Sequence, residues 1–236
     1  RLLGEKMNMI NSIREKLEDL SDIKLKEFNS KLSPNICKDN ILGIKIPTLR
    51  KFSKSLNDSE KEEFILSLPH KYLEENILHS IILSEIKDVN ELFARLDDYL
   101  PFVMSWCDCD TIKPLIFKKI HNENIHSKLI AYAENREEYV CRFGLVSLLS
   151  YYTKEYFNVN DIEVIKDIKS NFYYVNMAIS WYFSELLVNQ YNSVISLFES
   201  NELDLWIHNK SLQKALESFR IGANEKQYIR SLKRIV

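Results

Sequence analysis

The sequence predicts an all-α protein made of stacked helix pairs, and three observations support this fold class. Apolar residues recur three or four positions apart along nearly the whole chain, which is the spacing of a buried helix face. Only four Gly and five Pro interrupt the 236 residues, and the last proline is Pro114. The alternation of apolar and polar residues that marks a strand is hard to find.

The first elements are expected to be two short helices, over about residues 8–19 and 22–31, followed by a loop at Pro34. Ser21 and Asp22 stand where the second helix would begin, and both residue types cap helix N-termini.

A third helix is expected to begin at Pro47, because proline is favoured in the first turn of a helix. Asn57, Asp58 and Ser59 precede a glutamate-rich stretch and predict the next cap. Further helix faces follow from three apolar sets: Tyr72, Ile77 and Ile81; Leu145, Leu148 and Leu149; Leu212, Leu216 and Phe219.

A weak internal repeat appears when Met104, Val140, Val175 and Ile207 are placed in register, at intervals of 32 to 36 residues. Such a period is typical of stacked helical repeats. The positions two and six residues further on share one helix face, because residues four apart are neighbours on a helix. Those positions hold an unusual set of aromatic and polar groups: Trp106, Asp110, Arg142, Trp181, Asn209 and Gln213.

Composition limits the classes of function. With 34 acidic and 32 basic residues the net charge is −2, so a strong overall attraction to nucleic acid is absent and any DNA contact requires a local basic surface. No Ser/Gly-rich linker divides the chain. We expect residues 1–6 to be a possible remnant of expression cloning and residues 7–236 to form a single repeat domain.

The four cysteines follow no secretory signal, and no apolar run is long enough to span a bilayer, so we expect a cytoplasmic protein. Cys107 and Cys109 form a C-x-C pair without a second pair or a histidine partner. We therefore expect no metal.

Five segments in order resemble the AlkD-type DNA alkylation repair proteins, a family of HEAT-like repeat alkylpurine DNA glycosylases. Residues 42–51 resemble its G-[IV]-x-x-P-x-x-R signature, residues 105–112 its S-W-x-x-x-D segment and residues 178–181 its A-[IV]-x-W segment. Residues 140–144 and 209–218 are similar to its arginine-containing stretch and its terminal helices. The resemblance covers about residues 20 to 236.

The resemblance implies a right-handed superhelical solenoid of HEAT-like helix pairs whose concave side holds double-stranded DNA. It implies hydrolysis of the N-glycosidic bond of cationic alkylated purines, N3-alkyladenine and N7-alkylguanine, without a cofactor. Asp110, Trp106 and Trp181 would be the catalytic residues, and Arg142 would hold the DNA backbone. Lys45, Arg50 and Lys51, within the first signature segment, are further candidates for DNA binding.

Two departures leave the function open. The region ahead of Gly43 is short, which brings the chain closer to a subgroup of the family with a shortened N-terminal region, and the charge is near neutral. The alternative to an active monofunctional glycosylase is therefore a paralogue with weak or lost activity. Such a non-catalytic HEAT-like protein would bind a nucleic-acid structure or a protein partner. We expect a monomer that does not associate with membranes.

Several other polar side chains are interpreted as structural. Tyr173 and Tyr174 are expected to pack between helices, and Asp108 to point to a different helix face from Asp110. The scattered histidines are not expected to be catalytic.

Overall fold

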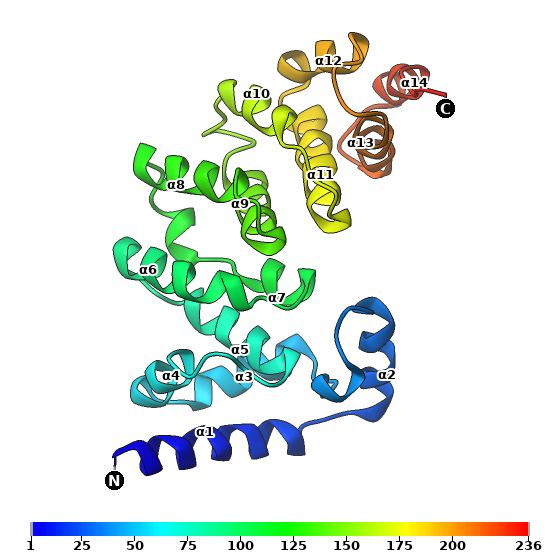
Figure 1. Cartoon of the computed structure of the whole chain (residues 1–236). Coiled ribbons are helices and arrows are strands. Elements are labelled where there is room, and N and C mark those ends of the chain that lie inside the picture. Colours follow the sequence, from blue (N-terminus) through cyan, green and yellow to red (C-terminus); the bar gives the residue numbers. More distant parts are fainter. Residues whose placement is uncertain (1, 236) are drawn as a thin grey trace. The chain divides into compact units, whose positions relative to one another are not determined.

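A computed structural model describes residues 2–235 of the chain, and the side chains of residues 9–235. The prediction of an all-α protein is confirmed, since residues 2–235 contain helices, turns and loops but no strand (Figure 1). The chain forms two compact units, unit 1 (Arg1–Lys119) and unit 2 (Ile120–Val236).

Unit 1 is built around one fully buried helix. Its α-helices are α1 (Leu2–Asp19), α2 (Ile23–Leu32), α3 (Ile46–Ser55), α4 (Asp58–Ile65), α5 (Leu73–Leu83), α6 (Val89–Tyr99) and α7 (Trp106–Thr111). Three short 3₁₀ helices are η1 (Lys38–Asn40), η2 (Leu100–Phe102) and η3 (Leu115–Lys118). Every residue of α5 is buried, and this helix packs against α3, α4, α6 and α7.

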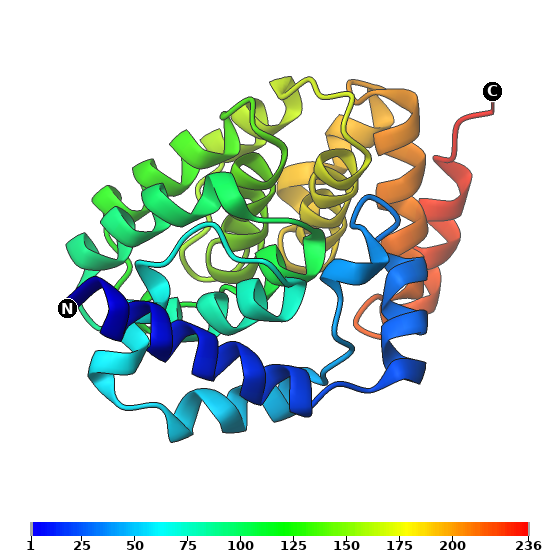
Figure 2. The same ribbon diagram turned by 60° about the horizontal axis from the view of Figure 1, so that its bottom comes forward.

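The N-terminal helices agree with the predicted ones except at the start of the first. Helix α1 already begins at Leu2 and runs beside α4 (Figure 2). Asp22 caps α2 by accepting hydrogen bonds from the backbone of Lys24 and Leu25, and Asn57 caps α4 in a capping box with Glu60. Because each cap satisfies amides that the first helical turn leaves open, these two helices begin where the sequence predicts.

Gly43 fixes the loop between α2 and α3. Its φ of 82° lies in the left-handed region, and an added Cβ would stand 2.3 Å from the carbonyl oxygen of Asp22. The buried carboxylate of Glu74 accepts hydrogen bonds from the backbone amides of Leu42, at 2.8 Å, and Gly43, at 2.7 Å. Only glycine fits here, which explains its place in the first signature.

Unit 2 is a row of consecutive helices. They are α8 (Glu123–Ala133), α9 (Glu138–Tyr151), α10 (Asn160–Asp167), α11 (Tyr173–Asn189), α12 (Tyr191–Glu199), α13 (Leu205–Glu217) and α14 (Ala223–Ser231). Helix α9 packs against α8 and α11, helix α11 also against α12 and α13, and α14 against α13 (Figure 1). Val140, Val175 and Ile207 are each the third residue of α9, α11 and α13, in agreement with the predicted register, whereas Met104 precedes the shorter α7.

The backbones of α8 and α9 come close together at Gly144. A Cβ on this residue would lie 2.3 Å from the amide nitrogen of Ala133 and 2.7 Å from the carbonyl oxygen of Leu129. The glycine in the segment of residues 140–144 is therefore a helix-packing residue.

One predicted helix face ends early. Leu212 is buried as expected, but α13 ends at Glu217 because Ser218 turns to an extended conformation, and Phe219 beyond it is fully exposed. The prediction that Phe219 continues this apolar helix face was wrong.

In the part of the chain that the structure describes, none of the helices combines the length and the apolar character needed to cross a membrane.

Candidate functional site

Helix α7 carries two of the three predicted catalytic residues. Trp106 and Asp110 are separated by four residues, so both side chains lie on one helix face, and both are half-buried. The indole Nε1 of Trp106 lies 3.4 Å from the carbonyl oxygen of Leu32 at the end of α2. Nδ2 of Asn35 donates a hydrogen bond to the carbonyl oxygen of Met104 at 3.1 Å. This bond joins the loop after α2 to the residues directly before α7.

Asp108 holds the beginning of α7 and has the structural role that the sequence predicts. Its Oδ1 accepts hydrogen bonds from the amide and the hydroxyl of Ser105, at 2.7 and 2.8 Å. Its Oδ2 accepts from the amide of Met104, at 2.8 Å, and from Nδ2 of Asn76 on α5, at 2.9 Å. Burial raises the pKa of the Asp108 carboxyl, and these hydrogen bonds oppose the increase.

The same polar cluster continues along α5. The hydroxyl of Ser80 donates to the carbonyl oxygen of Asp108 at 2.8 Å and lies 3.0 Å from the hydroxyl of Tyr99, which donates to the carbonyl of Asn76. A six-residue helix has little stability of its own. The orientation of α7 therefore depends on these buried contacts with α5.

The cysteines of α7 are unsuited to thiolate chemistry. Burial, reinforced by the neighbouring carboxylates of Asp108 and Asp110, raises the pKa of Cys107 to about 12, and Cys109 is buried. Among the described residues, no three His, Cys, Asp or Glu side chains are grouped as metal ligands.

The predicted DNA-binding residues Lys45, Arg50 and Lys51 all lie exposed at or on α3. Lys45 caps the helix through its backbone, while Arg50 and Lys51 occupy its second turn. Leu49 and Ser53 bury the opposite face of α3. Within residues 9–235 no ion pair engages the three cations, so their charges face solvent.

In unit 2, Arg142 joins two neighbouring helices. It is buried on α9 with 6% of its surface exposed, and its Nη1 donates to the carbonyl oxygen of Tyr174 in the first turn of α11, at 2.7 Å. Its guanidinium lies 5.9 Å from the centre of the Tyr174 ring. Burial raises the pKa of Glu138, one turn before Arg142, and the guanidinium opposes that increase.

Trp181, the third predicted catalytic residue, is half-buried on α11, with Nζ of Lys214 on α13 at 5.8 Å from its ring. A second pair lies on α13 itself, where Nζ of Lys210 is 5.7 Å from the ring of Trp206. Lys210 and Lys214 are one turn apart and so lie on the same side of the helix.

The rings of Tyr173 and Trp206 lie 5.9 Å apart, and those of Tyr173 and Tyr174 lie 5.3 Å apart. Tyr173 is 59% exposed, so the prediction that it packs between helices was wrong. We call the following set the aromatic–basic face of unit 2: Tyr173, Tyr174, Trp181, Trp206, Lys210 and Lys214.

The internal repeat of the sequence could have predicted two members of this face, Tyr174 and Trp206. The residue before each of Val140, Val175 and Ile207 is aromatic, and these residues are Tyr139, Tyr174 and Trp206. A repeated position places its side chains in a row on the equivalent helices of successive repeats, here α9, α11 and α13. The rings of Tyr139 and Tyr174 are 6.5 Å apart.

Asn209, expected in the polar column of the repeat, is used by the fold. Its Nδ2 donates to the carbonyl of Arg234, and its Oδ1 accepts from the amide of Arg234, both at 2.9 Å. Gln213, one turn later, is exposed.

A sequence profile described as DNA alkylation repair enzyme matches residues 13–205. The chain belongs to this family. No curated protein and no solved structure matches the chain. Membership supports a role in alkylation repair and suggests a DNA substrate. The matched region includes Trp106, Asp110, Arg142 and Trp181, whereas α14 lies beyond it.

Proposed function

We propose that this DNA alkylation repair enzyme hydrolyses the N-glycosidic bond of cationic alkylated purines in double-stranded DNA, with Asp110 as the central carboxylate. One observation carries the proposal most directly. Asp110 and Trp106 stand one turn apart, partly exposed, on a helix whose beginning is fixed by the buried Asp108. Such support is what a catalytic group needs to keep its position during the reaction.

The chemistry requires little beyond a placed carboxylate. In N3-alkyladenine and N7-alkylguanine the base carries a positive charge, so the bond from C1′ to the base nitrogen breaks with its electron pair moving to the base. Positive charge then develops on the sugar, where a carboxylate stabilises it. Water adds to C1′ and releases a proton, which Asp110 accepts directly or passes to solvent. The products are a neutral base and an abasic sugar.

The indoles act by contact with the sugar in this proposal. The face of Trp106 would lie against the deoxyribose and attract the developing cation through its ring electrons. Trp181 has a partly exposed ring of the same kind in unit 2, and we propose the same role for it. Lys214 already lies near that ring, which keeps a cation available for a DNA phosphate.

DNA binding is proposed to rest on exposed cations. Lys45, Arg50 and Lys51 are not engaged in ion pairs within residues 9–235, so they can neutralise phosphates without breaking an internal contact. Arg142 is buried and its Nη1 is bound to the carbonyl oxygen of Tyr174, and we propose that its planar guanidinium contacts the DNA backbone from this fixed position. Its contact with Tyr174 also orients the start of α11.

We further propose that the chain is a single HEAT-like repeat domain over residues 7–236, wound as a right-handed superhelix and acting as a cytoplasmic monomer. Closeness to the subgroup with a shortened N-terminal region remains a prediction. The alternative is a non-catalytic paralogue that binds a nucleic-acid structure or a protein. It predicts no release of methylated bases in the following experiment.

The test is release of N7-methylguanine and N3-methyladenine from methylated duplex DNA under single-turnover conditions at low salt. We expect release well above spontaneous depurination for the wild type, and a loss of about a hundredfold or more for Asp110→Asn. The matched control is Asp98→Asn, which removes an exposed carboxylate from α6 in the same unit and should retain full activity.

Release by Asp110→Asn at the wild-type rate would remove the carboxylate from the mechanism. No release by the wild type, together with retained DNA binding, would favour the non-catalytic paralogue.

A further inference from the structure

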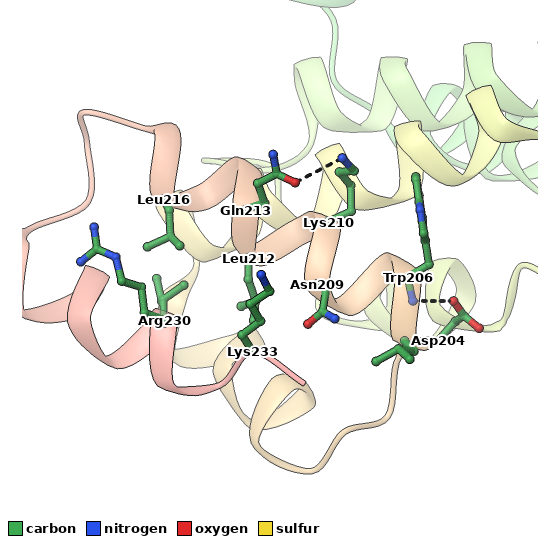
Figure 3. A pocket seen from close by; sticks show the side chains of 11 residues that line it. Asp204, Trp206, Asn209, Lys210, Leu212, Gln213, Leu216, Arg230 and Lys233 are labelled. Atoms are coloured by element: carbon green, nitrogen blue, oxygen red, sulfur yellow. Dashed lines mark hydrogen bonds between the residues drawn. The ribbon is translucent and has the colours of Figure 1, made fainter. Parts of the chain in front are cut away.

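A pocket of about 850 Å³ lies between α13 and α14 in unit 2 (Figure 3). Leu212 and Ile229, both buried, form part of its apolar wall together with Leu216. Arg230 on α14 and Lys233 just after its end contribute positive charge, as Figure 3 shows. The pocket thus combines an apolar interior with cations, and its volume is in the range of small-molecule sites.

Most other polar groups of the pocket are already engaged. Asp204, the only acidic residue of the lining, accepts a hydrogen bond from the amide of Trp206 at 2.9 Å and thereby caps α13. Asn209 is bound at both ends to the backbone of Arg234. Nζ of Lys210 donates to Oε1 of Gln213 at 3.2 Å. The only carboxylate of the lining, that of Asp204, therefore already has a structural role as the cap of α13.

Arg230 and Lys233 differ from these groups. Both are exposed, and within residues 9–235 no hydrogen bond or ion pair engages their side chains. Charged residues on a terminal helix usually form a solvated face, but these two line a pocket. A ligand with one or two negative charges would satisfy them without displacing an internal partner.

The pocket also has an aromatic ring in its lining, that of Trp206. Trp206 lines the pocket with 39% of its surface exposed, and Lys210 beside it adds a third cation near the ring. An exposed indole binds a planar, π-rich group by stacking, and bases of any sequence offer such a surface. Together these features select a ligand with a planar aromatic part and an anionic part.

We propose that the α13–α14 pocket binds a nucleoside monophosphate, with the base on Trp206 and the apolar wall and the phosphate on Arg230 and Lys233. The ligand is either a free nucleotide or the terminal nucleotide of a DNA strand, since both present the same chemistry. This inference does not depend on catalysis by Asp110.

The experiment is calorimetric titration of the full chain with adenosine 5′-monophosphate, adenosine and inorganic phosphate, at 150 mM salt, where non-specific attraction is weakened. We expect the nucleotide to bind at least about tenfold more tightly than either part alone, because each part loses one set of contacts. A single-stranded oligonucleotide with a 5′-terminal phosphate, compared with a circular one that has no end, distinguishes the two sources.

Arg230→Gln should weaken binding of adenosine 5′-monophosphate about tenfold, the loss of one charged hydrogen-bond donor. Lys226→Gln is the matched control, because it removes the same charge from the same helix at a residue outside the pocket and should leave the affinity unchanged. Trp206→Ala should weaken binding of the nucleotide but not of inorganic phosphate. Asp110→Asn should bind the nucleotide as the wild type does, which separates this test from that of the proposed function.

Three results would overturn the inference. One is the absence of nucleotide binding at millimolar concentration. Another is equal weakening by Arg230→Gln and Lys226→Gln, which would mean a general charge effect. The third is inorganic phosphate that binds as tightly as the nucleotide, which would leave the base without a site.

Discussion

The side-chain amide of Asn76 donates a hydrogen bond of 2.9 Å to Oδ2 of Asp108, and so joins the first turn of α5 to the first turn of α7. Both residues are completely buried. A buried carboxylate is stable only when its oxygens have donors. The two residues therefore form a polar contact that fixes the helix bearing Trp106 and Asp110 against the centre of unit 1.

Asp108→Asn is expected to destabilise unit 1 by about 3 kcal/mol, because the new amide group would face backbone donors that it cannot satisfy. Urea denaturation followed by circular dichroism measures this change. The exposed Asp98→Asn variant is the control and should stay within about 0.5 kcal/mol of the wild type. If Asp108→Asn were equally stable, the buried carboxylate would not hold α7.

Gly144→Ala is expected to destabilise unit 2 by about 3 kcal/mol, since its Cβ would overlap the backbone of α8 at Ala133 and Leu129. Thermal or urea unfolding gives the value. Gly222→Ala serves as the control, because its nearest neighbour would be a side-chain oxygen of Glu225 at 3.5 Å and its φ is −69°. Similar losses for both variants would contradict the close approach of α8 and α9.

Stability should fall as the pH is lowered below neutrality, because of the buried pair His70 and His79, whose Nε2 and Nδ1 lie 2.9 Å apart. Burial lowers the pKa of His70 to about 4, with Glu75 opposing and Arg14 reinforcing the decrease. Burial also lowers the pKa of His79 well below its usual value, reinforced by His70 and Arg95. Below pH 6.5 the unfolded chain therefore binds protons that the folded chain does not.

For His70 alone, the free energy of unfolding should decrease by about 1.4 kcal/mol between pH 8 and pH 5.5, and further as the pH approaches 4. Urea denaturation at a series of pH values measures this slope. In His70→Gln the slope should become smaller by the contribution of one histidine. An unchanged slope would mean that other groups cause the acid sensitivity.

The sequence predicts much of the fold because its signals are local. The caps Asp22 and Asn57 and the start of α3, one residue before the predicted Pro47, follow from residue types next to each other in the chain. The register of Val140, Val175 and Ile207 adds the order of the helices in unit 2. The prediction for Phe219 is wrong because apolar spacing does not reveal where a helix ends. Helix α13 ends before Phe219, since Ser218 has an extended backbone.

The candidate site was predicted less completely, since its support is not local. Asn76 and Asp108 are 32 residues apart, and nothing in either neighbourhood indicates that they meet. Tyr173 was assigned to helix packing because an aromatic residue beside apolar ones is usually buried, whereas its position at the first residue of α11 leaves it exposed. The pocket between α13 and α14 depends on how two helices pack, and no sequence motif marks it.

Replacing Arg50 and Lys51 together by glutamine should weaken binding of duplex DNA and make it less sensitive to salt. Each phosphate contact contributes about 0.9 to the slope of log affinity against log salt, so loss of both should lower that slope by about 2. Fluorescence anisotropy with a labelled duplex, at salt concentrations from about 25 to about 200 mM, measures this slope, because screening of charges changes strongly over that range. Lys24 on α2 and Lys87 in the loop between α5 and α6 are exposed cations outside α3 and give a matched double control. Since both double variants remove two charges, a general electrostatic effect would lower the two slopes equally. Only a larger decrease for the α3 pair is consistent with phosphate contacts at Arg50 and Lys51.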